Sequence, residues 1–151
     1  MTFEFVIYTD GSCPRNGIEP GEAGGGWASV CLVDGEPDDS YTVYGSDPST
    51  TNNRMELLAV IKGLEALPAD STVDVYSDSQ YVVYGIPQWI EHWVANDWPR
   101  RVKNADLWKE LLIARDRHNS VRFNYIKGHN GDKFNEMADS LAGVMAAKEI
   151  A

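Results

Sequence analysis

Short apolar stretches with a period of two occupy the first part of the chain. Residues 3–8 are almost all β-branched or aromatic, and Trp27–Val33 and Tyr41–Tyr44 repeat this strand pattern. The acidic segment Asp34–Ser40 is expected to be a turn, and the glycine- and proline-rich stretch Cys13–Gly26 a long loop. These patterns predict three strands in an antiparallel meander.

Helical periodicity begins after position 51. Asn52 and Asn53 are favoured helix caps, apolar residues recur at helical spacing from Leu57 to Leu64, and Pro68 marks the end. Five more elements are predicted in the second half of the chain: a strand at 73–78, a helical stretch at 81–97 interrupted by Gly85 and Pro87, a helix at about 105–117, a strand at 121–126, and a helix at 134–150 with Met137, Leu141, Val144 and Met145 on one side.

The order of these elements predicts an α/β fold, with a mixed sheet and helices on both faces. A length of 151 residues is that of one ordinary domain, so we expect a single domain over residues 1–151. The composition, 43% hydrophobic and 24% charged, is that of a globule with a sizeable core and makes wholesale disorder unexpected.

The net charge of −10 argues at first against a partner rich in phosphate, because lysine and arginine drive nonspecific binding to nucleic acids. The charge is unevenly distributed, however. Residues 1–96 carry three basic and fifteen acidic residues, whereas residues 97–133 carry nine basic and five acidic residues. The sequence therefore indicates an acidic region that could hold cations beside a mildly basic surface that could meet phosphate.

The cellular location is predicted from two features. The apolar runs are far shorter than the ~20 residues of a membrane span, and the N-terminal stretch is acidic and strand-like rather than a charged leader. Cys13 and Cys31 are too few for a disulfide framework and lack the CxxC spacing of zinc and redox sites. We expect a cytoplasmic protein with two reduced thiols.

Four acidic residues are the candidates for chemistry. Asp10 and Asp78 follow predicted strands, Glu56 lies in the first turn of a helix, and Asp139 lies inside the last helix. Each has an ordinary explanation as a turn residue, a helix cap, part of a capping box with Asn53, or an exposed helical residue. Together they are more informative, because ligands of α/β sheets collect at the carboxyl ends of strands. Crowded carboxylates need cations, and Mg²⁺ suits carboxylates and phosphate oxygens.

Five ordered motifs identify a family resemblance. They are YTDGS at 8–12, TTNNRMEL at 50–57, SDSQYV at 77–82, NADLW at 104–108 and IKGHNGDKFNEMADSLA at 126–142. With these motifs the chain resembles a ribonuclease H of type I from residue 3 to about 145. The resemblance implies a ribonuclease H-like fold whose five-stranded mixed sheet has three antiparallel strands followed by parallel ones.

The resemblance also implies an activity and a metal site. Enzymes of this kind are endonucleases that cut the RNA strand of RNA–DNA hybrids by two-metal hydrolysis, leaving 5′-phosphate and 3′-hydroxyl ends. The implied cofactor is a pair of Mg²⁺ ions, with Mn²⁺ as an alternative, and the implied metal ligands are Asp10, Glu56, Asp78 and Asp139. His129, in a loop bounded by glycines, is implied to assist proton movement or product release; an exposed structural histidine is its alternative.

The implied partner is an RNA–DNA hybrid, bound by a monomer with no other protein required. Thr51 and Asn104 match positions that hold a phosphate of the DNA strand. Trp89 and Trp93 either pack in the core or line the hybrid. The other implied contacts are polar residues near the active edge, Cys13, Asn16, Asn52, Asn53 and Gln80, and the bases of a protrusion, Arg100, Arg101 and Lys103.

Two departures from the family pattern affect hybrid binding. The basic protrusion is shortened, which favours weaker binding, a shallower salt dependence and a steeper dependence on metal. The loop Pro14–Ala23 is longer than usual and adds Glu19 and Glu22 near the binding edge, which places the contact of Asn16 in question.

Two other functions remain to be tested against the leading one. A hybrid-binding module without cleavage would not need all four carboxylates and His129. A metal nuclease of the same fold that cuts DNA, such as an integrase or a resolvase, gives no reason for the segments NNRME and SDSQ, whose counterparts sense RNA.

Overall fold

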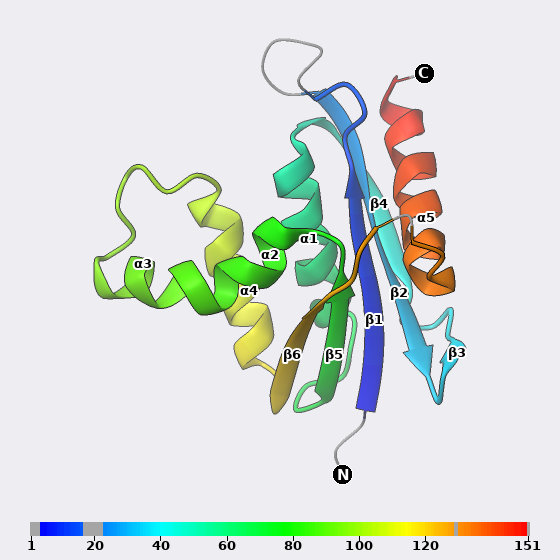
Figure 1. The fold of residues 1–151 in the computed structure, drawn as a ribbon, viewed down its shortest axis with the longest axis horizontal. Coiled ribbons are helices and arrows are strands. Elements are labelled where there is room, and N and C mark those ends of the chain that lie inside the picture. Colours follow the sequence, from blue (N-terminus) through cyan, green and yellow to red (C-terminus); the bar gives the residue numbers. More distant parts are fainter. Residues whose placement is uncertain (1–3, 17–22, 129, 151) are drawn as a thin grey trace.

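One mixed β-sheet organises the chain (Figure 1). The computed structural model describes residues 4–16, 23–128 and 130–150. Strands β1 and β5 are parallel neighbours at the centre, β6 continues the parallel side, and β2 pairs antiparallel with β1, β3 and β4. This arrangement confirms the predicted fold class, although the described sheet has six strands rather than the expected five because the short strand β3 is added. The strands are β1 (Glu4–Ser12), β2 (Ala23–Val33), β3 (Glu36–Pro37), β4 (Val43–Thr50), β5 (Thr72–Ser77) and β6 (Ser120–Tyr125).

Helices cover both faces of the sheet, as predicted (Figure 1). One core lies between the sheet and α1, α2 and α4, and contains Ile7, Leu57 and Trp108. A second core lies under α5 and contains Val30 and Leu32. The helical elements are α1 (Asn52–Glu65), α2 (Gln80–Gly85), the π-helical turn η1 (Ile86–Ile90), α3 (Glu91–Ala95), α4 (Ala105–Asp116) and α5 (Lys133–Ile150).

Several strand boundaries differ from the sequence prediction. Strand β1 runs on to Ser12, β2 begins at Ala23 within the predicted loop, and β4 extends to Thr50. The glycines of β2 resemble loop residues in sequence, but Gly26 lies against the backbone of α5, so that a Cβ atom there would overlap Ala142 O and Ala146 N. These glycines therefore permit close packing rather than a flexible loop.

The first hairpin is also tighter than predicted. Asp34 and Gly35 both adopt positive φ, at 54° and 80°, and Val33 pairs with Glu36. An Asp-Gly pair in this conformation forms a two-residue turn that matches the strand twist. Part of the predicted turn Asp34–Ser40 is therefore the short strand β3.

Two helix boundaries have physical causes that the sequence pattern concealed. Thr51, not an asparagine, caps α1, since its side-chain oxygen accepts a hydrogen bond from Arg54 N at 3.3 Å. The stretch from Gln80 to Ala95 is helical throughout, and Pro87 is accommodated in the widened turn η1. The interruption predicted at Gly85 and Pro87 is therefore a local change of pitch.

The apolar face of α5 matches the predicted one except at Val144, because Met137 and Leu141 pack on the second core and Met145 is buried. Val144 is 55% exposed, whereas Ala138, Ala142, Met145 and Ala146 are buried. The alanines lie on the side that contacts β2, where their small side chains allow the close approach at Gly26. Among the described residues, no helix combines the length and the apolar character needed to cross a membrane.

The contact between β2 and α5 can be tested with Gly26→Ala. We expect this variant to lose about 1–3 kcal/mol of unfolding free energy in urea, because overpacking forces the helix away from the strand. Gly143→Ala is the matched control: a Cβ at this position of α5 meets nothing within 4 Å, so stability should rise by about 0.5–1 kcal/mol. Equal stability of the two variants would contradict the close packing.

Candidate active site

The register of the two central parallel strands brings Asp10 and Asp78 together. The last paired residues of β1 and β5 are Thr9 and Ser77, and each aspartate is the next residue along its strand. Both carboxylates therefore lie at the carboxyl edge of the sheet, as the sequence predicted. Beyond Asp78 the chain turns into α2, which is capped by the Ser79 side chain through a hydrogen bond from Val82 N at 3.3 Å.

Glu56 reaches the same edge because α1 packs directly on β1 at Gly11. A Cβ atom on Gly11 would lie 2.5 Å from both Glu56 N and Met55 C, so only glycine fits there. The backbone N–H of Gly11 donates to Glu56 Oε1 and, at 3.0 Å, to Asp10 Oδ1. One peptide group thus orients two carboxylates, and Glu56 does not form the capping box considered from the sequence.

The resulting acidic cluster consists of Asp10, Glu56, Asp78 and Asp139. Carboxylate oxygens of the first three lie within 4.8 Å of one another. Asp139, from α5, comes within hydrogen-bonding reach of Asp10. Asn135, one turn earlier on the helix and 2% exposed, donates its side-chain amide to Asp78 Oδ2 at 3.4 Å. The structure therefore gathers all four predicted acids from two strands and two helices that are distant in sequence.

The electrostatics of the cluster favour added positive charge. Asp10 is 4% exposed and Glu56 8% exposed. Burial raises the pKa of Asp10 above its ordinary value, and the nearby charge of Glu56 raises it further. Burial also raises the pKa of Glu56, against the opposing effects of hydrogen bonds from neighbours including Gly11. Both groups therefore tend to keep their protons unless cations offset the charge of the ionised form.

The donor set fits hard divalent cations. All four side chains offer oxygen, and within the described residues the three convergent acids Asp10, Glu56 and Asp78 form the one such group of potential metal ligands. Carboxylates in small number, with room left for water and substrate oxygens, are the ligands that Mg²⁺ and Mn²⁺ favour.

Polar groups surround the N-terminus of α1 next to the cluster. Asn52 Oδ1 accepts a hydrogen bond from Cys13 N at 2.9 Å, and Asn16 Oδ1 accepts one from Asn52 N at 3.0 Å. The Cys13 thiol is buried and donates to carbonyl oxygens, including Ala23 O at 3.5 Å, so this residue can present only backbone atoms to a ligand. Asn53 and the side chain that opens α2, Gln80, are exposed.

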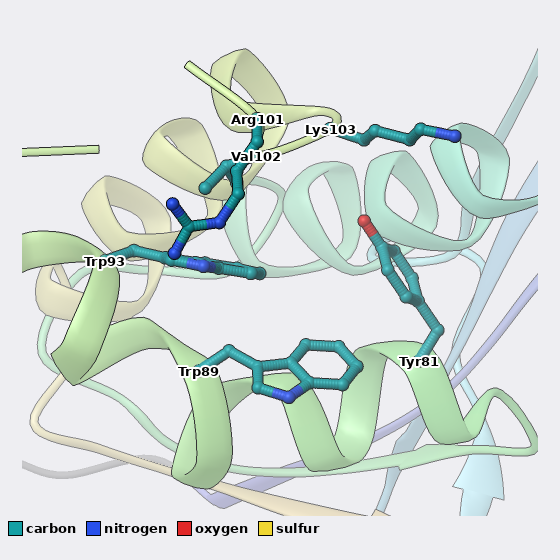
Figure 2. A pocket seen from close by; sticks show the side chains of 6 residues that line it. All are labelled: Tyr81, Trp89, Trp93, Arg101, Val102 and Lys103. Atoms are coloured by element: carbon teal, nitrogen blue, oxygen red, sulfur yellow. The ribbon is translucent and has the colours of Figure 1, made fainter. Parts of the chain in front are cut away.

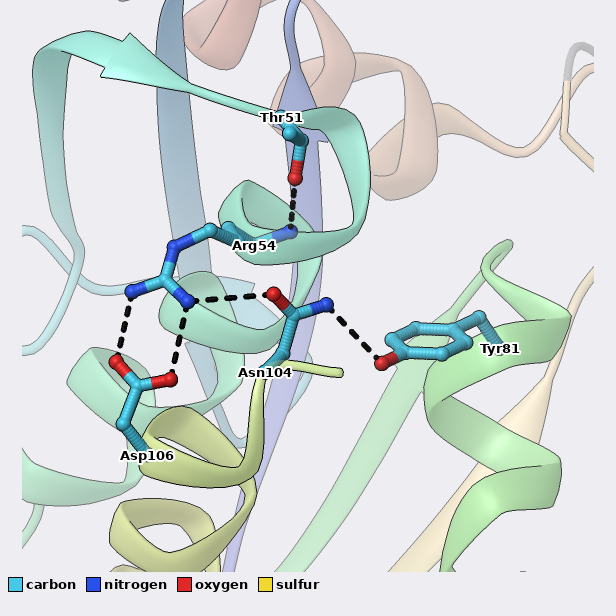
Figure 3. Close-up of polar contacts among 5 residues, drawn as sticks. All are labelled: Thr51, Arg54, Tyr81, Asn104 and Asp106. Carbon is cyan, nitrogen blue, oxygen red and sulfur yellow. Dashed lines mark hydrogen bonds and ion pairs between the residues drawn. The ribbon is translucent and has the colours of Figure 1, made fainter. Parts of the chain in front are cut away.

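A polar network links α1 to the start of α4 (Figure 3). Arg54 forms a two-pronged ion pair with Asp106, at 3.0 and 2.8 Å, and donates to Asn104 Oδ1 at 3.2 Å. Asn104 donates in turn to the Tyr81 hydroxyl oxygen at 3.2 Å. The two predicted phosphate contacts bond to opposite ends of Arg54: Thr51 Oγ1 accepts from its backbone N, and Asn104 Oδ1 accepts from its guanidinium.

An aromatic pocket of about 300 Å³ adjoins this network (Figure 2). The ring centroids of Trp89 and Trp93 are 5.7 Å apart, and Trp93 also meets the fully buried Trp108 at 5.7 Å. Trp93 therefore packs on the core, as one of the two alternatives has it, and also lines the pocket; its contact with the hybrid stays a prediction. The lining residues are Tyr81, Trp89, Trp93, Arg101, Val102 and Lys103.

The basic residues of 97–133 do not form one continuous surface. Arg101 and Lys103 line the pocket, and Arg100 is exposed on the loop between α3 and α4. Arg122, in contrast, pairs with Asp74 at 2.6 Å on β5, and Arg117 donates to the carbonyl oxygens that end α1. Only part of the positive segment therefore lies at the aromatic pocket.

Some predicted features lie outside the described residues. They are His129 and the two acids of the long loop, Glu19 and Glu22. The loop that carries position 129 nevertheless begins at the acidic cluster, since a Cβ atom on Gly128 would lie 2.6 Å from Asp78 Oδ2.

Comparison with known proteins agrees with this geometry. The RNase H family profile matches residues 3–147. The chain belongs to the ribonuclease H family, a family of endoribonucleases. It is 45% identical to a ribonuclease H of Wolbachia pipientis over 143 residues, covering 92% of each chain, and 45% identical to the ribonuclease HI of Caulobacter vibrioides over 146 residues, covering 94% of this chain and 92% of that one.

Solved structures of the family share the fold. The crystal structure of LC9-RNase H1, described as a type 1 RNase H with the type 2 active-site motif, superposes with a TM-score of 0.85 at 32% identity. It covers 99% of this chain and 74% of the other. The overlap includes every element that bears the acidic cluster.

Sequence reasoning overlooked three residues that support the site. Arg54 and Asp106 lie 52 positions apart, and Tyr81 joins them through Asn104, so no local spacing reveals the network. Asn135 lies one turn before Asp139 on α5, and its bond to Asp78 depends on how α5 crosses the sheet. The sequence signal that could reveal these residues is their position inside the five family motifs.

Repulsion within the acidic cluster predicts that Asp10→Asn stabilises the metal-free protein. Because the folded-state pKa values of Asp10 and Glu56 are raised, the folded chain binds more protons than the unfolded chain above pH ~4, and stability falls as the pH rises. In urea with EDTA at pH 7.5, we expect a gain on the order of 1–2 kcal/mol, the size of about one pKa unit. The gain should shrink at pH 4.

Asp39→Asn is the control for this experiment, because Asp39 is exposed and lies outside the acidic cluster. Its unfolding free energy should match that of the wild type at both pH values. A destabilised Asp10→Asn protein at pH 7.5 would show that repulsion is not the dominant force at this site.

Proposed function

We propose that this chain is an endonuclease that hydrolyses the RNA strand of RNA–DNA hybrids and leaves 5′-phosphate and 3′-hydroxyl ends. The observation that carries the proposal is the convergence of Asp10, Glu56 and Asp78 at one edge of the sheet in a member of the ribonuclease H family. Asp139 completes this set from the opposite face of the sheet.

The proposed chemistry divides between cations and protein groups. Two Mg²⁺ ions, or Mn²⁺ in their place, would be held by the four carboxylates and would supply an activated water and charge stabilisation at the phosphate. Gly11 N–H holds Glu56 and Asp10 in position, and the Asn135 amide orients Asp78. The water loses a proton as its oxygen bonds to phosphorus, the bond from phosphorus to the 3′ oxygen breaks, and that oxygen gains a proton. We assign the movement of this proton, or the release of product, to His129.

Recognition of RNA is proposed to occur around the N-terminus of α1. A shallow minor groove exposes 2′-hydroxyl groups, which short polar side chains and backbone groups can contact. The groups available are the backbone of Cys13 and the side chains of Asn16, Asn52, Asn53 and Gln80. We assign the other strand to Thr51 and Asn104, with Arg100, Arg101 and Lys103 facing phosphates.

The protein is proposed to act as a monomer in the cytoplasm. All four carboxylates come from one chain, so no second copy is needed to complete the site. Both cysteines are buried free thiols, which fits a reducing compartment.

Cleavage assays test the activity. With Mg²⁺, we expect cutting of an RNA–DNA hybrid but not of RNA duplex or DNA duplex, and a loss of at least 100-fold in rate for Asp10→Asn, because removal of one ligand disrupts metal binding. Asp39→Asn should retain the wild-type rate. Cutting of DNA duplex would favour the DNA nuclease, and hybrid binding without cutting would favour the binding module.

The salt dependence of hybrid binding tests the role of the protrusion. With three bases facing phosphates, log K should fall against log salt with a slope of roughly −2 to −3. Arg101→Ala and Lys103→Ala should each reduce the slope by about 1. Arg122→Gln is the control, since Arg122 pairs with Asp74 on the sheet away from the pocket. A wild-type slope near −8 would contradict the shortened protrusion.

A further inference from the structure

We propose that the Tyr81 hydroxyl donates a hydrogen bond to a backbone phosphate of the bound hybrid, and that Arg54 and Asp106 fix it in this role through Asn104. The inference rests on the proposed function, because the hybrid is the ligand. It adds a binding residue, Tyr81, and two positioning residues that do not touch the nucleic acid.

The first step is the orientation of the Asn104 amide. A guanidinium group has only donors, so the atom of Asn104 that faces Arg54 Nη1 at 3.2 Å must be the amide oxygen. Arg54 cannot rotate away easily, because Asp106 holds it through two bonds of 3.0 and 2.8 Å. The NH₂ group of Asn104 must therefore face Tyr81, as Figure 3 shows.

The second step concerns the lone pairs of the Tyr81 oxygen. It accepts from Asn104 Nδ2 at 3.2 Å and from Trp108 Nε1 at 2.9 Å, and an indole nitrogen can only donate. Neither neighbour can accept the hydroxyl hydrogen. With both lone pairs engaged, the O–H bond must point away from them, and its partner must come from outside the network.

The third step identifies that partner from the pocket. Tyr81 lines the pocket together with Arg101 and Lys103, and none of the residues that line it carries a carboxylate. Figure 2 shows the Tyr81 hydroxyl pointing toward the side on which Lys103 lies. An acceptor that is met by a hydroxyl donor and two cations is an anionic oxygen, and on nucleic acid this is a phosphate.

The backbone of Asn104 shows why the positioning residues are needed. Its φ of 61° and ψ of 27° place it in the left-handed region, which asparagine tolerates at some cost. Its side chain caps nothing in α4 and is instead committed to Arg54 and Tyr81. Loss of Arg54 would release the amide and allow the Tyr81 hydroxyl to turn toward it.

The test measures hybrid binding in EDTA, so that cleavage does not contribute. A set of hybrids carries one neutral methylphosphonate each, at successive positions on either strand. The penalty at a position is the loss of affinity that its methylphosphonate causes. For the wild type, one position should show the largest penalty. In Tyr81→Phe, affinity for the unmodified hybrid should fall roughly 10- to 100-fold, the value of one hydrogen bond to a charged group, and the penalty at that position should shrink by the same factor.

Two further variants separate contact from folding. Phenylalanine at position 81 leaves Trp108 Nε1 unpaired, but a loss of stability alone would weaken every hybrid equally and leave each penalty unchanged. Arg54→Met should shrink the penalty at the same phosphate although Arg54 does not reach it. Tyr84→Phe, an exposed tyrosine of α2 whose ring meets Tyr125, should match the wild type throughout.

If Tyr81→Phe showed the same penalty as the wild type at every methylphosphonate position, the inference would be overturned. The same result together with hybrid cleavage by the wild type would leave the proposed function standing. Absence of hybrid binding by the wild type would instead remove both.

Discussion

The contact of the β1 backbone at Gly11 with the first turns of α1 determines where the chemistry lies. A side chain at this position would meet Met55 and Glu56 at 2.5 Å, so strand and helix can touch only through glycine. This contact brings the Glu56 side chain next to Asp10, and both carboxylates accept a hydrogen bond from the backbone N–H of Gly11. The parallel pairing of β1 with β5 then adds Asp78 from the next strand.

That convergence opposes folding, because burial and like charge both disfavour ionised carboxylates. The fold tolerates the cluster because its members are held by elements with separate cores. Leu57 anchors α1 on one face of the sheet, and Ala138 anchors α5 on the other. The edge of the sheet that could bind cations is therefore electrostatically unfavourable as long as no cation offsets the charge of its carboxylates.

Periodicity predicted most elements and made the four acids candidates, which the family motifs then selected, but it did not predict the contacts made by small residues. Gly26 reads as part of a loop because its role, close approach to Ala142 and Ala146, depends on a helix more than a hundred positions later. Apolar spacing groups Val144 with the buried side of α5, because spacing cannot show that alanines face the strand. Acidic residues at strand ends were easier to recognise, because sheet topology alone brings them together.

The net charge of −10 also says little about binding, because a sum does not show where each charged residue lies. Arg54 could have been a phosphate contact, yet Asp106 holds it at 2.8 Å, where it fixes the direction of an amide instead. Arg122 is likewise committed to Asp74. The protein therefore brings few unpaired bases to its pocket and must rely more on oriented neutral donors. In such a pocket the geometry of each hydrogen bond matters more than the number of positive charges, because a neutral donor acts only at contact distance whereas charge acts over a Debye length.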